Sequence, residues 1–259
     1  MDKFFITTGR NTNASCIKKA ELLAAQHNVP FIFRSDKSLQ QLKAEQTYAV
    51  ALLVKKTGLY IDTPNGTIFF HPNMAQLRIK KLLENKPDNM ITAMDLRRGM
   101  SVLDCTLGFA SDALVSAFIC KTPVIGLESS SLLYAVITDG LQNFSSNIPN
   151  INEAARLIKP ANLNHIDYLK KLPNKSIDIV YFDPMFRHPL MNSTNLQPLR
   201  CLADTAPVTS KSIHEACRIA RHRVVLKENS KSHEFLRLGF KERIGSRYSS
   251  VHYGIIKIE

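Results

Sequence analysis

Residues 102–114, VLDCTLGFASDAL, run from an apolar stretch through an acid and a glycine into a segment with helical spacing. Asp104 ends the apolar stretch, Gly108 lies in the turn, and a helix is expected to begin near Ser111 and Asp112. In such a strand–turn–helix unit, backbone N–H groups at the helix start face a ligand. The G-x-G-x-x-G fingerprint and the G-x-x-x-x-G-K-[ST] phosphate loop are both absent, so a nicotinamide enzyme or an NTPase is disfavoured.

The alternation of strand and helix continues to the end of the chain. Short apolar runs that end in charged or small residues stand at 101–105, 123–128, 177–183 and 223–228. Segments with helical spacing separate them at 111–118, 131–141 and 210–221. This pattern predicts an α/β fold with a mostly parallel, Rossmann-like doubly wound sheet. Ligands of such sheets bind beyond the carboxyl ends of the strands, so the site is expected there.

The first ninety residues have a different pattern. Strands are expected at 3–8, 29–33 and 48–54, with a helix at 15–26 after the capping residue Asn13. A hairpin is predicted from 59–71, because Asn65-Gly66 is a strong signal for a tight turn. We therefore predict a small α+β unit over residues 1–90, followed by the doubly wound domain over residues 91–259.

An amphipathic helix is predicted at residues 73–86, with Arg78, Lys80 and Lys81 on or near its polar side. These cations fit either an ordinary solvated face or a helix that faces RNA. The whole chain of 259 residues has 34 Lys and Arg against 22 Asp and Glu, a formal net charge of +12. Such a surface favours polyanions such as RNA or DNA, because each neutralised phosphate releases counterions.

Composition also bears on the compartment and on metals. No apolar stretch approaches the roughly 20 residues of a membrane-spanning helix, and residues 1–11 do not resemble a signal peptide. The five cysteines form no C-x-x-C pair, so we expect reduced thiols, a cytoplasmic protein and no metal site.

Acids at the ends of the predicted strands suggest the ligand. Asp104 repels a pyrophosphate but suits a ligand with an amino group and a positive charge, such as S-adenosylmethionine (SAM). Glu128 closes the next strand and can accept hydrogen bonds from ribose hydroxyls. Asp167, in LNHIDYL at 163–169, can either meet an adenine amino group or serve as a helix cap.

The run DIVYFDPMFRH, residues 178–188, places an acid, a proline and an aromatic residue at the end of a buried strand. The Asp183 carboxylate and a nearby carbonyl can accept the two N–H bonds of a base amine, which turns the nitrogen lone pair toward a methyl donor. Pro184 fixes φ and holds these acceptors, and Phe186 offers a face for stacking an extruded base. The alternative is a purely structural turn.

These residues together resemble class I SAM-dependent methyltransferases, and most closely the RsmJ family, which methylates the N2 amine of a guanine in small-subunit ribosomal RNA. The first motif of that family, approximately D-A-T-A-G-L-G-R-D-A, is similar to residues 104–113, and its D-P-M-F is reproduced at residues 183–186. His188 and the strand ending in Lys227 are also similar. The resemblance implies SAM as the cofactor, and ribosomal RNA or the small ribosomal subunit as the partner.

The resemblance implies roles by position. The catalytic residues would be Asp183, Pro184 and Phe186. The cofactor would be held by Asp104, Thr106, Gly108, Ser111, Asp112, Glu128, Ser129, Asp167, Tyr168 and Asp183. RNA would be contacted by Arg78, Lys80, Lys81, Arg187, His188 and Lys227.

Several family residues differ in this chain. A glycine is replaced by Ala110, an arginine by Ser111, a basic residue common after Glu128 by Ser129, and small cofactor-contacting residues by Asp167 and Tyr168. Because alanine adopts positive φ at a cost, we expect either a different turn or weaker SAM binding. Two alternatives to an rRNA guanine-N2 methyltransferase follow. The first is a SAM-dependent methyltransferase of another RNA, of DNA or of a small amine. The second is a non-catalytic RNA-binding module with a decayed cofactor motif.

Overall fold

The computed structural model describes residues 4–184, 202 and 206–259, and these form two compact units. The first unit contains residues 4–71 and 131–143, and the second contains residues 72–130, 144–184 and 206–259. This division differs from the predicted boundary at residue 90 in the assignment of two helices. Helix α3 (Asn73–Leu83) belongs to the second unit, and helix α6 (Ser131–Asn143) belongs to the first.

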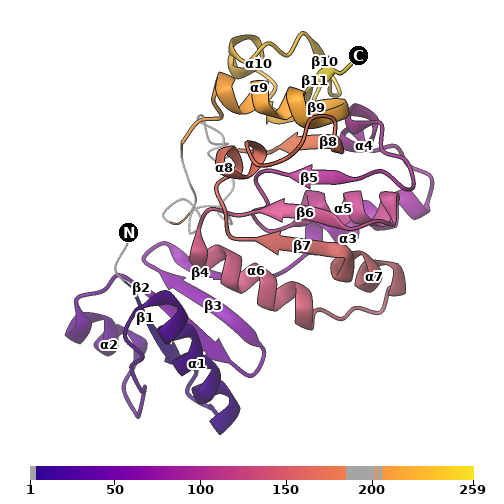
Figure 1. Cartoon of the computed structure of the whole chain (residues 1–259). Coiled ribbons are helices and arrows are strands. Elements are labelled where there is room, and N and C mark those ends of the chain that lie inside the picture. Colours follow the sequence, from indigo (N-terminus) through magenta and orange to yellow (C-terminus); the bar gives the residue numbers. More distant parts are fainter. Residues whose placement is uncertain (1–3, 185–201, 203–205) are drawn as a thin grey trace. The chain divides into compact units, whose positions relative to one another are not determined.

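The first unit is built on a four-stranded sheet in the order β1-β2-β3-β4 (Figure 1). Strands β1 and β2 are parallel, and the other neighbours are antiparallel. The elements besides α6 are β1 (Phe4–Thr8), α1 (Ala14–His27), α2 (Leu39–Gln46), β2 (Val50–Lys55), β3 (Gly58–Thr63) and β4 (Gly66–Phe69). The predicted hairpin is confirmed as β3–β4, but the strand expected at 29–33 is wrong, since only Phe31 forms an isolated bridge, with Ile6.

Helix α6 joins the first unit through polar and apolar contacts. Asp139 accepts the backbone N–H of Leu59 in β3 at 3.1 Å and pairs with Lys19 of α1. Gly140 faces Phe70, and a Cβ at this position would lie 2.2 Å from the Cβ of Phe70. A helical glycine costs about 1 kcal/mol relative to alanine, and the close approach of Phe70 explains why it stands here.

The second unit contains a seven-stranded sheet in the order β10-β11-β9-β8-β5-β6-β7. Strands β9, β8, β5, β6 and β7 are parallel, while β11 is antiparallel to both β9 and β10. The strands are β5 (Val102–Asp104), β6 (Val124–Leu127), β7 (Ile158–Ala161), β8 (Ile177–Phe182), β9 (Ala220–Asn229), β10 (Glu242–Ile244) and β11 (Val251–Lys257). The predicted doubly wound α/β fold is confirmed, and the strand order reverses between β5 and β8, where such sheets bind ligands.

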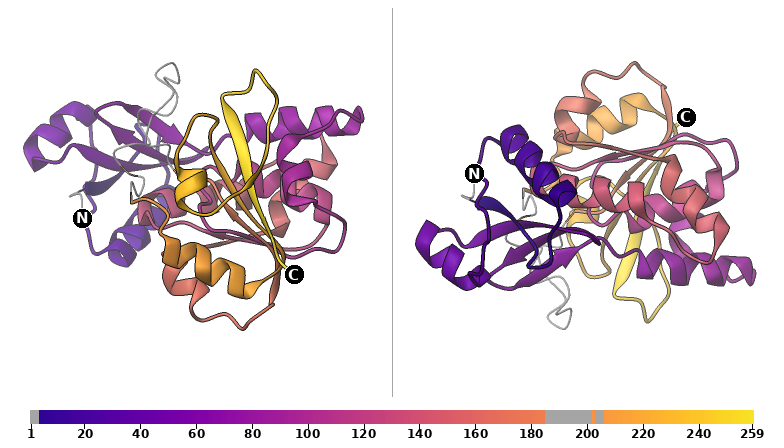
Figure 2. Two further views of the ribbon diagram at one scale, coloured as in Figure 1. Left: turned by 90° about the horizontal axis from the view of Figure 1, so that it is seen from above. Right: turned by 90° about the horizontal axis from the view of Figure 1, so that it is seen from below.

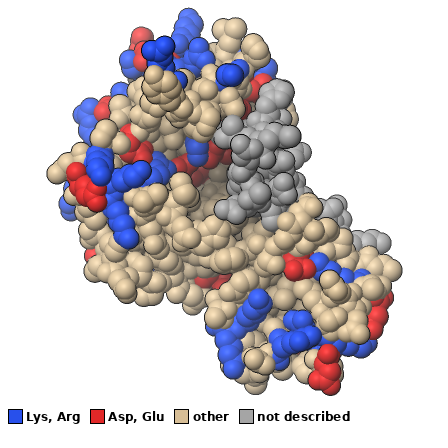
Figure 3. Space-filling view, turned by 180° about the vertical axis from the view of Figure 1, so that it is seen from behind, with Lys and Arg blue, Asp and Glu red and all other residues tan. Residues whose placement is uncertain are grey.

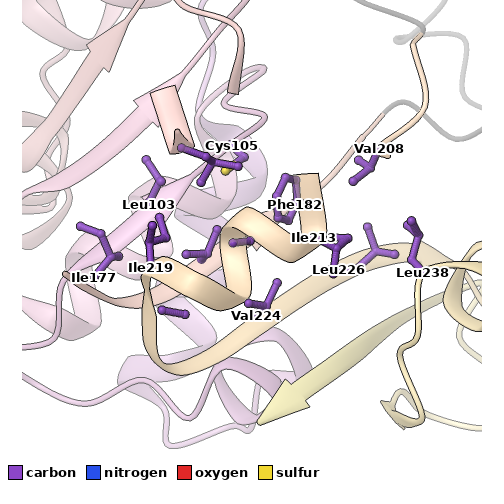
Figure 4. Packing of buried hydrophobic residues seen from close by; sticks show 14 of the residues in the cluster. Leu103, Cys105, Ile177, Phe182, Val208, Ile213, Ile219, Val224, Leu226 and Leu238 are labelled. Atoms are coloured by element: carbon purple, nitrogen blue, oxygen red, sulfur yellow. The ribbon is translucent and has the colours of Figure 1, made fainter. Parts of the chain in front are cut away.

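Helices cover both faces of this sheet (Figure 2). Besides α3 they are α4 (Asn89–Met94), α5 (Ser111–Cys120), α7 (Pro149–Leu157), α8 (His165–Leu169), α9 (Ser210–Ile219) and α10 (Glu234–Arg237). On one face, α9 packs over the buried side chains of Phe182, Val224 and Leu226, together with Ile213 and Ile219 of its own (Figure 4). The central strands β5, β6 and β8 are largely buried, which explains their nearly continuous apolar sequence.

The described cysteines, Cys16, Cys105, Cys120 and Cys217, are free thiols. Among the described residues, no helix is long and apolar enough to cross a membrane.

Candidate functional site

The site lies in the second unit, at the carboxyl ends of three neighbouring strands. Asp104 ends β5, Glu128 follows β6, and Asp183 follows β8. The backbone N–H of Asp183 donates to Oγ1 of Thr106 at 2.6 Å, and the backbone N–H of Thr106 donates to Oδ1 of Asp104 at 3.0 Å. These two bonds join the turn after β5 to the turn after β8. Acidic atoms are visible in a hollow of this unit in Figure 3.

Asp104 is a buried carboxylate, 2% exposed, that forms no ion pair with any described residue. Burial raises its pKa to about 8, and the nearby charges of Asp112 and Asp183 add to the rise, while the Thr106 N–H opposes it. A buried acid without a cation is costly unless it is protonated or a ligand supplies the charge. Asp104 thus fits the amino group and positive charge of the ligand predicted from the sequence.

Glu128 is held in one orientation by two backbone groups. Its Oε2 accepts the N–H of Gly108 at 3.1 Å, and its Oε1 accepts the N–H of Ser130 at 2.8 Å. The carboxylate therefore ties the end of β6 to the turn after β5, and its further lone pairs can accept ribose hydroxyls.

The turn between β5 and α5 has the left-handed conformation at two residues. Gly108 has φ 48°, and Ala110 has φ 58° although it carries a methyl group. The backbone of Ala110 thus reaches the left-handed region in spite of the absence of glycine, at a cost of about 1–2 kcal/mol. Weaker SAM binding, the other outcome expected from Ala110, stays a prediction.

Asp112, in the first turn of α5, is the centre of a buried ion network. Its Oδ1 pairs with Arg78, and its Oδ2 accepts from the Tyr181 hydroxyl at 2.8 Å and from Lys227 Nζ at 3.0 Å. Burial alone would raise the pKa of Asp112, but Lys227 and Arg78 outweigh it and hold the pKa well below its usual range. Asp112 therefore stays ionised, and its charge positions the two cations.

Asp183 shares the Lys227 ammonium with Asp112. Its Oδ2 lies 2.7 Å from Lys227 Nζ, and its side chain keeps 27% exposure. Burial raises the pKa of Asp183 to about 6, with Lys227 opposing the rise and Asp112 adding to it. Asp183 is thus an accessible carboxylate that is ionised at neutral pH, and no donor among the described residues bonds its Oδ1.

The substitution Lys227→Met removes the cation between these two carboxylates. Breaking a buried ion pair by removing one partner costs about 3–5 kcal/mol, so a large fall in Tm is expected in differential scanning fluorimetry. The exposed Lys231→Met is the matched control. The pKa of Asp183 should rise further, so the pH below which methyl transfer declines should also rise. A variant with unchanged Tm and pH profile would contradict this assignment.

Other residues predicted at the cofactor lie at the same edge of the sheet with different exposure. Ser111 begins α5, and Ser129 follows Glu128 and is exposed. Asp167 is 64% exposed in α8, whose cap is Asn164 rather than Asp167. Tyr168 is partly buried against the core. Their contact with cofactor stays a prediction.

The residues predicted to contact RNA fall into three groups. Arg78 and Lys227 are about one-fifth exposed and pair with carboxylates inside the unit, which gives them a positioning role. Lys80 and Lys81 are exposed on α3, and Lys81 lines a cavity of about 260 Å³ beside Arg78 and Tyr253. Phe186, Arg187 and His188 lie outside the described residues, whereas Pro184 is described and half-buried.

Sequence reasoning missed three members of the network. Asp88 caps α4 and forms a two-bond ion pair with Arg78, at 2.7 and 2.9 Å. Tyr181 lies within the apolar strand β8, and a buried tyrosine needs a hydrogen-bond partner, which was a usable signal. Tyr253 of β11 lies close enough to the network for Asp112 to raise its pKa, after burial as the main cause.

The chain is similar to known proteins over most of its length. Residues 36–241 match the family described as "Putative SAM-dependent methyltransferase". "Uncharacterized protein YpiP" of Bacillus subtilis is 35% identical over 257 residues, covering 97% of this chain and 98% of that protein. "Ribosomal RNA small subunit methyltransferase J" of Legionella pneumophila (strain Lens) is 28% identical over 216 residues and covers 81% of each chain.

A solved structure supports the fold. The crystal structure of a SAM-dependent methyltransferase from Neisseria gonorrhoeae superposes with a TM-score of 0.64 at 15% identity, covering 97% of this chain and 95% of that one. Within the part of the chain that the structure describes, no cluster of His, Cys, Asp and Glu could hold a metal ion.

Proposed function

Because this chain belongs to the SAM-dependent methyltransferase family, with SAM as its cofactor, we propose that it methylates an exocyclic amine of a base in RNA. The specific acceptor that we propose is the N2 amine of a guanine in small-subunit ribosomal RNA. The similarity to the Legionella methyltransferase J supports this choice of substrate. The same similarity supports ribosomal RNA or the small ribosomal subunit as the partner.

One observation carries the proposal: Asp183 is an accessible carboxylate fixed beside the turn that begins the cofactor site. Its backbone N–H is bonded to Thr106, and one of its oxygens is held by Lys227. The other oxygen is available to accept an N–H of the acceptor amine. Accepting that bond draws the nitrogen lone pair out of conjugation with the ring. Pro184 restricts the backbone that follows, so that the acceptors keep their positions.

The proposed cofactor residues fit SAM in charge. Asp104 supplies the buried carboxylate for its cationic amino acid portion, and Glu128 supplies acceptors for its ribose. Bound SAM provides an electrophilic methyl group on a sulfonium. The chain's own part is to orient the amine at Asp183. Once methylated, the cationic amine releases a proton to Asp183 or to water.

The test is transfer of a radiolabelled methyl group from SAM to ribosomal RNA and to small subunits from cells that lack this protein. The labelled nucleoside is then identified by mass spectrometry. N2-methylguanosine is the expected product. Label in another base, in DNA or in a small amine would replace the proposed acceptor with that one. Unlabelled RNA in the presence of intact SAM binding would contradict an RNA substrate.

The cytoplasmic location stays a prediction.

A further inference from the structure

The first unit contains a basic cavity whose lining residues have no role assigned above. Its volume is about 520 Å³, and four of its lining residues are cations: Arg10, Arg34, Lys55 and Lys56. Two parallel strands lead into it: residues 9–12 follow β1, Lys55 ends β2, and residues 56–57 follow β2. The Gly9 N–H donates to the Val54 carbonyl at 3.0 Å, which holds the two strand ends together.

The charges in this cavity are not balanced within the described part of the chain. Arg10, Lys55 and Lys56 have no acidic partner among the described residues, and the one acid lining the cavity, Asp62, is paired with Lys43. Burial and the neighbouring Arg10 charge lower the pKa of Arg34. Cations gathered without acids repel one another, so a bound anion would stabilise them. In Figure 3, several Lys and Arg side chains lie on this unit, at the lower right, with Asp and Glu side chains among them.

Aromatic side chains stand beside the cations on the same face of the sheet. Lys55 Nζ lies 3.9 Å from the centroid of the Tyr60 ring, and Tyr60 is the cross-strand partner of Phe69, with centroids 5.3 Å apart. His71 continues the row at 5.2 Å from Phe69. Phe69 is 40% exposed, although a large apolar residue on a strand is more often covered.

We infer that this surface binds single-stranded RNA, with phosphates in the cavity at Arg10, Arg34, Lys55 and Lys56 and a base stacked on the exposed ring of Phe69. Cations that follow the backbone, combined with exposed rings, are the usual means of holding single strands. The neutral donors Asn11, Thr12 and Thr57 also line the cavity and suit phosphate oxygens. The inference deepens the proposed function, since it assigns RNA contact to residues other than those of the methyl-transfer site.

The test measures RNA affinity of the full chain by fluorescence anisotropy with a labelled single-stranded RNA over a range of salt concentrations. The variant Arg10→Gln with Lys56→Gln removes two exposed cations of the cavity. The control, Lys18→Gln with Lys231→Gln, removes two exposed lysines outside it. We expect the cavity variant to bind at least about tenfold more weakly and its salt slope to fall by about 1.4, for two phosphate contacts at about 0.7 each.

Phe69→Ala tests the stacking surface separately. Loss of one stacked base should weaken binding about five- to a hundredfold and leave the salt slope unchanged, since no charge is removed. Equal affinities for the cavity and control variants, or an unchanged Phe69→Ala affinity, would overturn the inference. Binding is measured without turnover. The cavity variants can therefore lose RNA binding even if the wild-type chain methylates no RNA. That combination would refute the proposed acceptor and support the RNA-binding surface.

Discussion

Replacing Asp183 with alanine is expected to lower methyl transfer by about 10²–10³-fold, the typical cost of removing one group that stabilises a transition state. The acceptor amine loses the carboxylate that takes its N–H and aligns its lone pair. Single-turnover transfer at saturating SAM measures this loss. Calorimetry should show that SAM still binds through the other predicted cofactor residues, though without the Asp183 contact, and the fold should survive because Lys227 keeps its bond to Asp112.

Two controls make the Asp183 result specific. Asp183→Asn keeps one oxygen acceptor in the same place and should retain intermediate activity. Asp36→Ala removes an exposed acid that has no role assigned above and should have little effect on the transfer step. Wild-type activity should also fall below about pH 6, because protonation of Asp183, whose pKa is about 6, removes the acceptor. Transfer by Asp183→Ala within tenfold of wild type would refute the role.

The substitution Asp104→Asn is expected to weaken SAM binding while stabilising the fold at neutral and higher pH. The amide keeps an acceptor for the Thr106 N–H but offers no charge to the cationic ligand. A hydrogen bond to a charged group contributes about 1.5–3 kcal/mol, so calorimetry should show a dissociation constant roughly ten- to a hundredfold higher.

The stability effect follows from the pKa of Asp104, which is raised to about 8 in the folded chain against about 3.9 in the unfolded chain. Between these values the folded state binds the extra proton, so unfolding free energy falls as pH rises, by up to about 1.4 kcal/mol per pH unit. Asp104→Asn should remove this contribution, which appears as a difference between the wild-type and variant slopes in denaturant titrations.

The number of protons released on SAM binding tests the role of Asp104 independently. SAM binding to wild type at pH 7 should release close to one proton, because the ligand cation favours ionised Asp104. Calorimetry in buffers with different ionisation enthalpies measures that release. Equal proton release and equal affinity in Asp104→Asn would show that Asp104 does not meet the cation.

The features that could be predicted from the sequence are those that short-range patterns determine. The β5–α5 turn, the β3–β4 hairpin and strand β8 all arise from local spacing, and the acids that follow the strands are brought to one edge by parallel pairing. The strand expected at 29–33 was wrong because Pro30 has no N–H to donate, and Phe31 alone forms a bridge.

The ion network could not be predicted in the same way. Arg78 and Asp112 are 34 positions apart, and their pairing depends on how α3 packs against α5. The basic residues of 73–86 were expected at a polar surface, whereas Arg78 points to buried acids. Helical periodicity gives the face of a residue only approximately, and a long side chain can then reach a partner that no local pattern reveals.

The placement of α6 has a consequence for synthesis of the protein. The segment that completes the first unit is encoded between β6 and β7 of the second, so the first unit cannot close until residue 143 has left the ribosome. By then β5 and β6 have emerged, but β7, β8 and β9 have not. The first unit can therefore be completed while the second is still emerging. Removal of residues 1–90 would take α3 from the second unit and leave α6 without its partners in α1 and β3.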